Sequence, residues 1–547
     1  MKKLSPFMKG TVFLIVTGCI TKIAGFGNRM YLSQLIGAKE IGVYQLIMPV
    51  YAFLFSLCCQ GVQTSLTKQI SHIYTEKLDE SQKQTLSAFI LRISIVITMS
   101  VALLAWYILF RKAAWIATCI LRAPQCELCI KWLSYTIPFF CVKGCIHGYY
   151  LGKQNSSLQG NSQLFEQLFR IAAIYIIANC GICKSSYTAI LAVWGSVIGE
   201  AASCIYTILH HRVLYRREMN GLYYQNKAVK SGGSLYHLSK IKKDYTKLLL
   251  RDSILFSTNK LSVTLLQSVE AILIPNMLML YYLDSNTSLA LYGALTGMSL
   301  PFILFPSTIT ASLSAMLLPE VASNNTQKGI VHIKAISEKT IGFCLIIGIF
   351  STVFFFLFGN TLGTLLFHSK TAGHYIMSLS WLCPLIYLSQ TLVSIQNGLG
   401  YTVYSLLCSI IASVIRIAFI LILVPYVGIQ GCLWGMLCSY IVLLILLFAL
   451  LIPKLKLKLS LWTYMVFPAI LAWGYGRICL QLYHKTELYV RNNLPIFQSY
   501  TKQLPIERLP DSLVSLFILV AGTATYSMLF FGTILAIRFI KEHKNRG

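Results

Sequence analysis

GTVFLIVTGCITKIAGFGNRMYLSQLIG, residues 10–37, is apolar and long enough to cross a bilayer, yet it carries Lys22 and Arg29 in its interior. A membrane-spanning helix needs about 20 residues at about 1.5 Å of rise each. Helical spacing places Gly18, Lys22, Gly25 and Arg29 on one stripe. Because a cation at the bilayer centre costs about 2.5–3.5 kcal/mol, we expect this stripe to line a watery cavity that holds an anionic substrate. Alternatively, the two cations lie near opposite ends of the helix and extend to the lipid headgroups.

The rest of the chain has the composition of a polytopic membrane protein. It has 547 residues, of which 56% are hydrophobic and only 12% are charged, and its mean hydropathy is +0.66. A soluble protein would carry roughly twice that charged fraction. The first apolar stretch exceeds signal-peptide length and no cleavage site follows it, so we expect it to remain as the first helix.

We predict an all-α membrane protein of about fourteen transmembrane helices, separated by Gly, Pro or short charged loops. The predicted segments are 10–36, 42–67, 87–110, 132–151, 161–179, 186–209, 253–280, 288–318, 340–358, 375–397, 402–424, 429–452, 459–483 and 511–537.

The basic residues indicate how the chain is oriented. Of the 46 Lys and Arg residues, 27 fall on the predicted side of the N-terminus, 11 on the other side, and eight within or at the ends of helices. The positive-inside rule therefore places both termini in the cytoplasm. The net charge of +28 follows from this topology, and no basic domain with interleaved aromatic residues indicates nucleic acid as a partner.

An internal repeat predicts two similar lobes. Gly152 lies 18 residues before Arg170, and Gly398 lies 18 before Arg416, at an offset of 246, with Trp-Gly pairs at 194–195 and 434–435. Such a parallel repeat gives lobes related by an axis along the membrane normal, with a substrate site between them. The expected divisions are an N-lobe over 1–209, a basic cytoplasmic linker over 210–252, a C-lobe over 253–452, and two further helices with a cytoplasmic tail over 453–547.

Segment 161–179 has a polar face formed by Gln163, Glu166, Gln167 and Arg170. Glu166 and Arg170 are spaced i, i+4 in the favourable order for an ion pair. In lipid such a face must pair internally or meet water. It is therefore either a cavity wall or a polar clamp between helices.

Other polar residues lie within the predicted C-lobe. Arg416 has no acidic neighbour four residues away, so its partner must come from another helix or from a ligand. Segment 253–280 carries Lys260, Gln267 and Glu270, followed by Pro275. A proline there either bends a gating helix or simply ends the segment.

Several kinds of chemistry are not indicated. The chain has no phosphate-binding loop, dinucleotide fingerprint or HExxH helix, and we expect no cofactor. The CxxC pairs at 126–129 and 180–183 fall in predicted outer loops on either side of two membrane crossings, so neither a zinc site nor a disulfide is favoured. His147, His368 and His374 are isolated, and we interpret them as structural.

Several motifs of the chain form a recognisable combination: TKIAGFGNR (21–29), GVY (42–44), GYYLGKQN (148–155), QLFEQLFR (163–170), EAILIP (270–275), LYGALTGMSLP (291–301) and LP (318–319). Together they resemble the stage V sporulation protein B family, in the polysaccharide-transporter branch of the multidrug/oligosaccharidyl-lipid/polysaccharide (MOP) flippase superfamily. The resemblance spans residues 5–450.

This resemblance implies a two-lobed fold like that of MATE transporters and lipid II flippases, and a carrier that flips an undecaprenyl-diphosphate-linked saccharide to the outer leaflet. It implies a link to peptidoglycan, including that of the spore cortex, and to the cell-wall synthesis machinery. The charged family positions matched here are Lys22, Arg29, Glu166, Arg170, Glu270 and Arg416. His147 and Asn276 stand where the family usually has Arg.

We therefore predict a lipid-linked saccharide flippase rather than an enzyme, coupled to Na⁺, H⁺ or the membrane potential. The predicted substrate-binding residues are Lys22, Arg29, Lys260 and Arg416, and the predicted cavity or structural network comprises Gln163, Glu166, Gln167, Arg170 and Glu270. The alternatives are a drug or cation antiporter of the same superfamily, a membrane glycosyltransferase or ligase using the same lipid donor, and a non-transporting scaffold.

Overall fold

The computed structural model describes residues 6–75, 79–180, 188–226, 235–323, 330–457, 460, 462–500 and 511–544. These residues are helical almost throughout, and no strand occurs among them. The chain forms two compact units, Met1–Gly293 with Ile420–Gly428, and Ala294–Phe419 with Ile429–Gly547.

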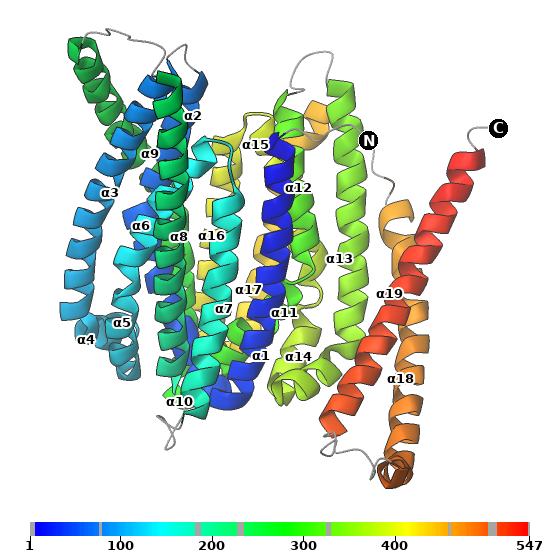
Figure 1. Ribbon diagram of the computed structural model, residues 1–547. Coiled ribbons are helices and arrows are strands. Elements are labelled where there is room, and N and C mark those ends of the chain that lie inside the picture. The colour runs from blue at the N-terminus through cyan, green and yellow to red at the C-terminus, as the bar shows by residue number, and fades with distance from the viewer. Residues whose placement is uncertain are drawn as a thin grey trace. The chain divides into compact units, whose positions relative to one another are not determined.

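The first unit is built from long helices joined by short breaks (Figure 1). Its elements are α1 (Pro6–Phe55), η1 (Ser56–Gln60), α2 (Gly61–Thr75), α3 (Glu80–Arg111), α4 (Ala113–Trp115), η2 (Ile116–Ile120), η3 (Pro124–Cys126), α5 (Glu127–Ser134), α6 (Thr136–Gly152), α7 (Ser157–Asn179), α8 (Ala189–Asn226), α9 (Leu235–Tyr282) and α10 (Ser285–Tyr292). The last turns of α16, Ile420–Gly428, also belong to this unit.

The second unit contains the remaining helices, among which α18 and α19 pack against each other. Its elements are η4 (Gly293–Ser299), whose first residue belongs to the first unit, α11 (Leu300–Ile303), α12 (Ser307–Ser323), α13 (Ile330–Phe367), α14 (Lys370–Leu379), α15 (Leu382–Gly398), α16 (Thr402–Val427), α17 (Ile429–Leu455), η5 (Trp462–Val466), α18 (Phe467–Tyr500) and α19 (Asp511–Lys544).

Local sequence explains where several helices begin and bend. Gly37 interrupts α1 with φ 78° and ψ 171°, between the two segments predicted at 10–36 and 42–67. Only glycine adopts that conformation without strain, so the chain can turn there between two helices. Asp284 caps α10, because its carboxylate accepts hydrogen bonds from the backbone N–H groups of Asn286 and Thr287 at 3.1 and 3.0 Å. Hydrogen bonds from Thr287 and Asn286 stabilise the charged form and lower the pKa of Asp284.

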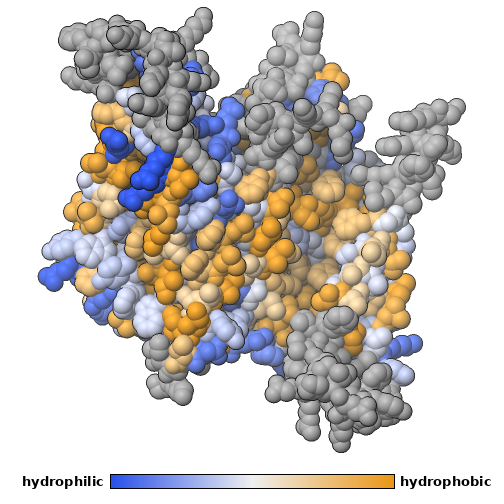
Figure 2. All heavy atoms as spheres, viewed as in Figure 1, coloured by the Kyte–Doolittle hydropathy of each residue, from blue (hydrophilic) through white to orange (hydrophobic). Residues whose placement is uncertain are grey.

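The helices have the length and surface of membrane spans. Among the described residues, eight helices are long and apolar enough to cross a bilayer, and ten if two bent pairs each form one span. Large apolar side chains lie on the outside, such as Val96 (64% exposed) and Leu104 (61%) on α3. Figure 2 shows hydrophobic residues covering the middle of the helices on the visible face. The chain is thus an all-α, multi-pass membrane protein, and the number fourteen stays a prediction.

The sequence repeat corresponds to a repeat in helix packing. A methyl group at Gly152 of α6 would lie 2.6 Å from Cβ of Ile70 on α2, and one at Gly398 of α15 would lie 2.8 Å from Cβ of Val321 on α12. Both distances are too short for a side chain, so glycine permits the same close approach of two helices in each unit. The bounds of α6 and α15 differ by the same offset of 246 residues as the repeat.

The described parts of the predicted linker 210–252 are helical, since α8 continues to Asn226 and α9 begins at Leu235. Its glycine-containing segment 231–234 lies outside the described residues. At its end, Asp252 accepts a hydrogen bond from Lys68 of α2 at 2.8 Å and so ties α9 to α2. The predicted lobe boundaries themselves stay a prediction.

Candidate functional site

The stripe predicted on α1 lies beside the polar face of α7. Lys22 and Arg29 are both exposed, and a methyl group at Gly25 would lie 3.4 Å from Nε2 of Gln167. Arg29 makes no hydrogen bond or ion pair with another described residue. Because a cation that has no carboxylate partner attracts anions, Arg29 is a candidate for contact with a ligand.

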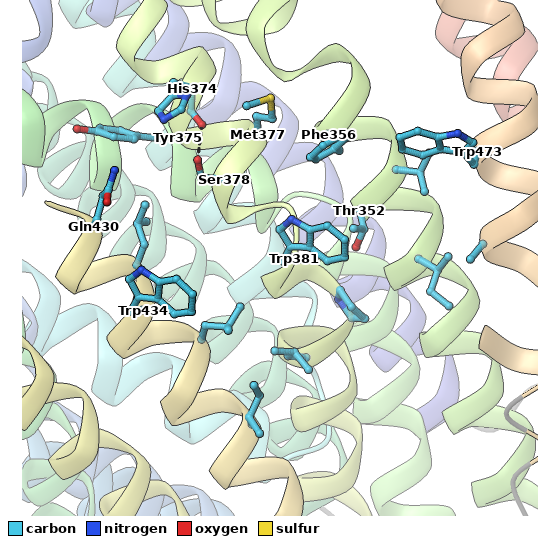
Figure 3. A pocket seen from close by; sticks show the side chains of 18 of the residues that line it. Thr352, Phe356, His374, Tyr375, Met377, Ser378, Trp381, Gln430, Trp434 and Trp473 are labelled. Atoms are coloured by element: carbon cyan, nitrogen blue, oxygen red, sulfur yellow. Dashed lines mark hydrogen bonds between the residues drawn. The ribbon is translucent and has the colours of Figure 1, made fainter. Parts of the chain in front are cut away.

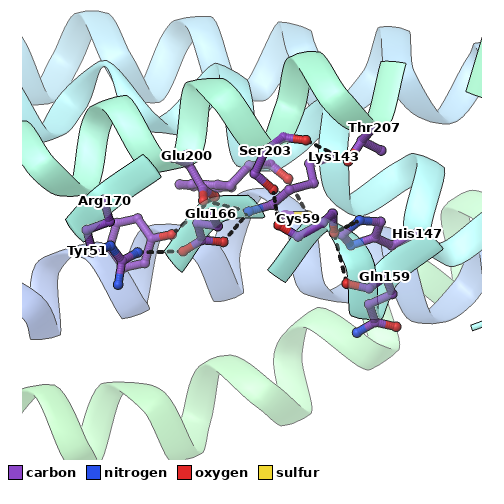
Figure 4. A network of polar contacts seen from close by, with 12 residues as sticks. Tyr51, Cys59, Lys143, His147, Gln159, Glu166, Arg170, Glu200, Ser203 and Thr207 are labelled. Atoms are coloured by element: carbon purple, nitrogen blue, oxygen red, sulfur yellow. Dashed lines mark hydrogen bonds and ion pairs between the residues drawn. The ribbon is translucent and has the colours of Figure 1, made fainter. Parts of the chain in front are cut away.

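A compact ion-pair network lies on the neighbouring helices of the same unit (Figure 4). Nζ of Lys143 on α6 lies 2.9 Å from Oε2 of Glu166 on α7 and 2.5 Å from Oε2 of Glu200 on α8. The three side chains are 12%, 21% and 4% exposed, respectively. One lysine therefore donates to two carboxylates in a largely water-excluded place, and its single charge offsets one of the two.

Two further residues extend this network. Arg170 donates to Oε1 of Glu166 at 2.5 Å, so the ion pair predicted from the i, i+4 spacing is present. Tyr51 of α1 donates to Oε1 of Glu200 at 3.5 Å. The network thus connects α1, α6, α7 and α8, as a polar clamp would. Arg29 lies close enough to Arg170 to interact with it electrostatically. With Arg29 included, three cations (Lys143, Arg170 and Arg29) accompany two carboxylates.

Several polar atoms beside this network have no hydrogen-bond partner among the described residues. They are Nε2 of Gln167, Nε of Arg170 and Oδ1 of Asn28. Buried polar atoms are normally hydrogen-bonded, so such atoms require an explanation. Two of the three belong to donors, which suits an anionic or polar ligand better than a cation.

His147 lies one turn of α6 from Lys143 and is 6% exposed. Its Nε2 is 2.8 Å from Oγ of Ser162 on α7, and that hydroxyl donates to the carbonyl oxygen of Gln159 at 2.9 Å. The hydroxyl proton is thereby used, so Nε2 of His147 carries the hydrogen in this pair. His147 therefore joins α6 to α7 through this hydrogen bond.

The predicted residues of α9 have different environments. Lys260 and Gln267 are exposed, whereas Glu270 is 7% exposed. Ser268 donates to the carbonyl oxygen of Pro49 at 3.2 Å, so this part of α9 packs against α1. Helix α9 continues to Tyr282, and Pro275 therefore does not end it.

Arg416 finds its partners on α17, within the second unit. Its Nε donates to Oγ of Ser439 at 3.0 Å, and the guanidinium carbon lies 5.0 Å from the centroid of the Tyr440 ring. Both contacts join α16 to α17. Arg416 thus has partners on another helix, one of the two possibilities that follow from the lack of an acidic residue four positions away.

The structure thus brings together Glu166, Gln167 and Arg170 with Lys22 and Arg29 nearby, and Gln163 is partly buried on the same helix. Lys143 and Glu200, which complete the network, were not singled out from the sequence. The available signal was a lone charge inside each apolar segment. The roles of Lys260, Glu270 and Arg416 stay predictions.

No group of three or more His, Cys, Asp or Glu side chains among the described residues forms a metal site. Cys126 and Cys129 are buried and not joined by a disulfide. Burial raises the pKa of both thiols to about 12, so they are protonated and poor zinc ligands. Of the second CxxC pair, Cys180 is exposed and Cys183 lies outside the described residues.

The chain is similar to sporulation proteins of Bacillus subtilis. Stage V sporulation protein B of Bacillus subtilis (strain 168) is 24% identical over 428 residues, which cover 78% of this chain and 79% of that protein. Sporulation protein YkvU of the same organism is 19% identical over 468 residues, covering 84% and 98%.

Two solved structures share the fold. The lipid II flippase MurJ in an inward closed conformation has a TM-score of 0.61 at 12% identity and covers 96% of this chain and 100% of that one. An inward-facing multidrug resistance transporter of the MATE family in the MOP superfamily has a TM-score of 0.60 at 11% identity, covering 80% and 95%. These likenesses confirm the predicted architecture.

A family model described as polysaccharide biosynthesis protein matches residues 7–324, more than half of the chain. The predicted resemblance to the stage V sporulation protein B family is thereby confirmed, and the chain belongs to the polysaccharide biosynthesis protein family.

Proposed function

We propose that this protein flips an undecaprenyl-diphosphate-linked saccharide from the inner to the outer leaflet of the bacterial cytoplasmic membrane. The saccharide would be a peptidoglycan precursor, and because the names of two relatives refer to sporulation, we propose the spore cortex as its destination. Family membership and the fold shared with a lipid II flippase support this function.

The observation that carries the proposal is the exposed, unpaired Arg29 on the stripe that it shares with Lys22. An unpaired cation within an apolar helix is retained at a cost in free energy, which a bound anion would offset. A diphosphate carries the charge needed, and charge-assisted hydrogen bonds strengthen where water is partly excluded. The donors of Gln167 and Arg170 that lack partners are close to this stripe and would add two hydrogen bonds.

Other cations would take part less directly. The side chain of Lys260 is exposed and has no hydrogen bond or ion pair with another described residue, so its ammonium group is available for a ligand. Arg416 already donates from its Nε to Ser439, so we give it a smaller part in binding the diphosphate than Arg29. We propose that transport proceeds by alternating access, driven by Na⁺, H⁺ or the membrane potential, with both termini in the cytoplasm.

Cation efflux is less well supported. A cationic drug or coupling ion would need an acidic side chain to bind it. Glu166 and Glu200, the acids of the first unit's network, are both already paired with Lys143.

The test is transport of a fluorescent undecaprenyl-diphosphate saccharide across proteoliposomes, measured by its accessibility to an external modifying enzyme. We expect the wild-type protein to move the lipid and the Lys22→Ala/Arg29→Ala variant to lose nearly all transport, because the diphosphate loses its counter-charges. Arg92→Ala is the matched control, because Arg92 is also an exposed cation on a membrane helix, α3, away from the stripe.

Transport by the double variant at the wild-type rate would exclude the α1 stripe as the binding site. If the folded wild-type protein moves no lipid-linked saccharide, the flippase assignment itself fails, and efflux of cations would be measured next.

A further inference from the structure

The second unit contains a cavity of about 1550 Å³ between α13, α14, α15, α17 and α18 (Figure 3). None of the residues that line it is Asp, Glu, Lys or Arg. The three largest side chains in its wall are Trp381, Trp434 and Trp473.

Most polar residues of the cavity wall lie at one end; the hydroxyl of Thr352, elsewhere in the wall, donates to backbone carbonyl oxygens. Thr371, His374 and Ser378 of α14 and Gln430 near the start of α17 lie together, and Figure 3 shows the last three with Tyr375. The remaining lining residues are mainly aliphatic or aromatic. A cavity with a hydrogen-bonding end and a long apolar wall matches an amphiphile rather than a water-soluble ligand.

The cavity lies on helices long enough to span a membrane, and this position indicates that lipid covers it. Helices α13 and α17, and residues 462–489 of η5 and α18, are long and apolar enough to cross a bilayer. In the cavity wall Trp381 is 58% exposed, Trp434 57% and Ile470 62%. Such a surface on membrane helices faces lipid chains, so a lipid is the occupant that the position favours.

The first unit has an aromatic ring at the equivalent place. By the offset of 246, Tyr135 corresponds to Trp381, and the Trp-Gly repeat pairs Trp194 with Trp434. In the first unit, Trp132 lies between the two, with ring centroids 5.8 Å from Tyr135 and 5.7 Å from Trp194.

The same offset places Ser378 of the second unit at the position of Trp132. Ser378 lines the cavity, and its hydroxyl donates to the carbonyl oxygen of His374 at 3.0 Å. The small side chain of Ser378 therefore leaves room at a position that a tryptophan occupies in the first unit.

We propose that this cavity is a binding site for a bilayer phospholipid, with an acyl chain along the tryptophan wall and the phosphate at the polar end formed by Thr371, His374 and Gln430. Threonine, histidine and glutamine side chains donate hydrogen bonds to a phosphate oxygen. The absence of Lys and Arg from the lining residues fits a zwitterionic headgroup rather than a diphosphate. The site does not depend on the proposed transport reaction.

The test uses phosphatidylethanolamine with a photoactivatable group in its acyl chain, incorporated into nanodiscs with the full-length protein. After irradiation, mass spectrometry maps the labelled peptides. We expect label on the segments containing Trp381, Trp434 and Trp473. Ser378→Trp, which installs the residue of the first repeat, should reduce this label several-fold.

Gly474→Trp provides a second filling variant from the opposite wall, since no atom lies within 4 Å of a Cβ at Gly474. Gly522→Trp on α19 is the matched control, because its Cβ also meets open space but Gly522 does not line the cavity. A melting temperature close to that of the wild type identifies which variants are folded.

Label that is spread evenly over the chain, or that persists unchanged in the folded filling variants, would overturn the proposal. Displacement of the label by an equal amount of undecaprenyl phosphate would also overturn it, since the site would then prefer a polyprenyl chain. Loss of transport with normal labelling would instead bear only on the flippase assignment.

Discussion

Lys143 holds two carboxylates apart inside the helical bundle of the first unit. Replacing it by methionine would leave Glu166 and Glu200 facing each other with little water to screen them. Removing one partner of a buried ion pair destabilises a protein by about 3–5 kcal/mol. We therefore expect Lys143→Met to lower the thermal unfolding temperature of the detergent-purified protein markedly.

The double variant Lys143→Met/Glu200→Gln is the informative partner of that experiment. It removes one negative charge together with the lysine, and Arg170 remains to compensate Glu166, so part of the lost stability should return. Arg92→Met removes an exposed cation from α3 and should change little. A Lys143→Met protein as stable as the wild type would mean that the network contributes nothing to folding.

The sequence predicts contacts of this kind only within one helix. Glu166 and Arg170 are four residues apart, so helical spacing alone indicates their pairing. Lys143 lies 23 residues from Glu166 and 57 from Glu200, and its pairing with them depends on how three helices pack. Arg416 and Ser439, 23 residues apart, illustrate the same limit. Spacing shows that a membrane-embedded charge needs a partner but not which helix supplies it.

Within α1 the bend at Gly37 depends on backbone conformation alone. Gly37 has φ 78° and ψ 171°, and no atom lies within 4 Å of a Cβ built there. Gly37→Ala therefore introduces strain without a steric clash, and such conformations cost of order 1–3 kcal/mol in non-glycine residues. We expect a lower unfolding temperature and, if the bend moves during transport, a slower rate in the proteoliposome assay.

Gly27→Ala is the matched control for that substitution, since its Cβ also meets open space but the residue lies in a regular part of α1. Alanine is favoured over glycine in a helix interior by roughly 0.5–1 kcal/mol, so this variant should be as stable as the wild type or slightly more stable. Equal effects of the two substitutions would show that the bend at Gly37 does not constrain the protein.

Helix boundaries were predictable where a glycine stands at the end of a predicted segment. Gly37 ends the first segment because its φ is positive, and the glycines at 152 and 398 mark the ends of α6 and α15. Pro275 was a weaker guide. It lies inside α9, because neighbouring groups in a membrane protein can satisfy the carbonyl that a proline leaves free.

On the scale of the whole molecule, the repeat predicts which helices are equivalent but not which of them associate. Helices α9 and α10 and residues Ile420–Gly428 belong to the first compact unit. Their association depends on contacts between distant parts of the chain, such as Lys68 with Asp252 and the ring of Tyr281 with Gly428. The hydrophobic periodicity within one segment does not predict contacts between segments.

The orientation of the chain can be tested with its own cysteines. Among the described cysteines only Cys119 and Cys180 are exposed, and the distribution of Lys and Arg places both on the outer side. In the first unit, α4, just before Cys119, lies at the opposite end from the start of α1 (Figure 1). A membrane-impermeant maleimide added to intact cells should therefore label the protein, and a variant with serine at 119, 180 and 183 should lose that label. A permeant maleimide measures the total reactive thiol. Labelling of the wild type only after the cells are opened would invert the topology, place the termini outside, and reverse the direction of the proposed transport.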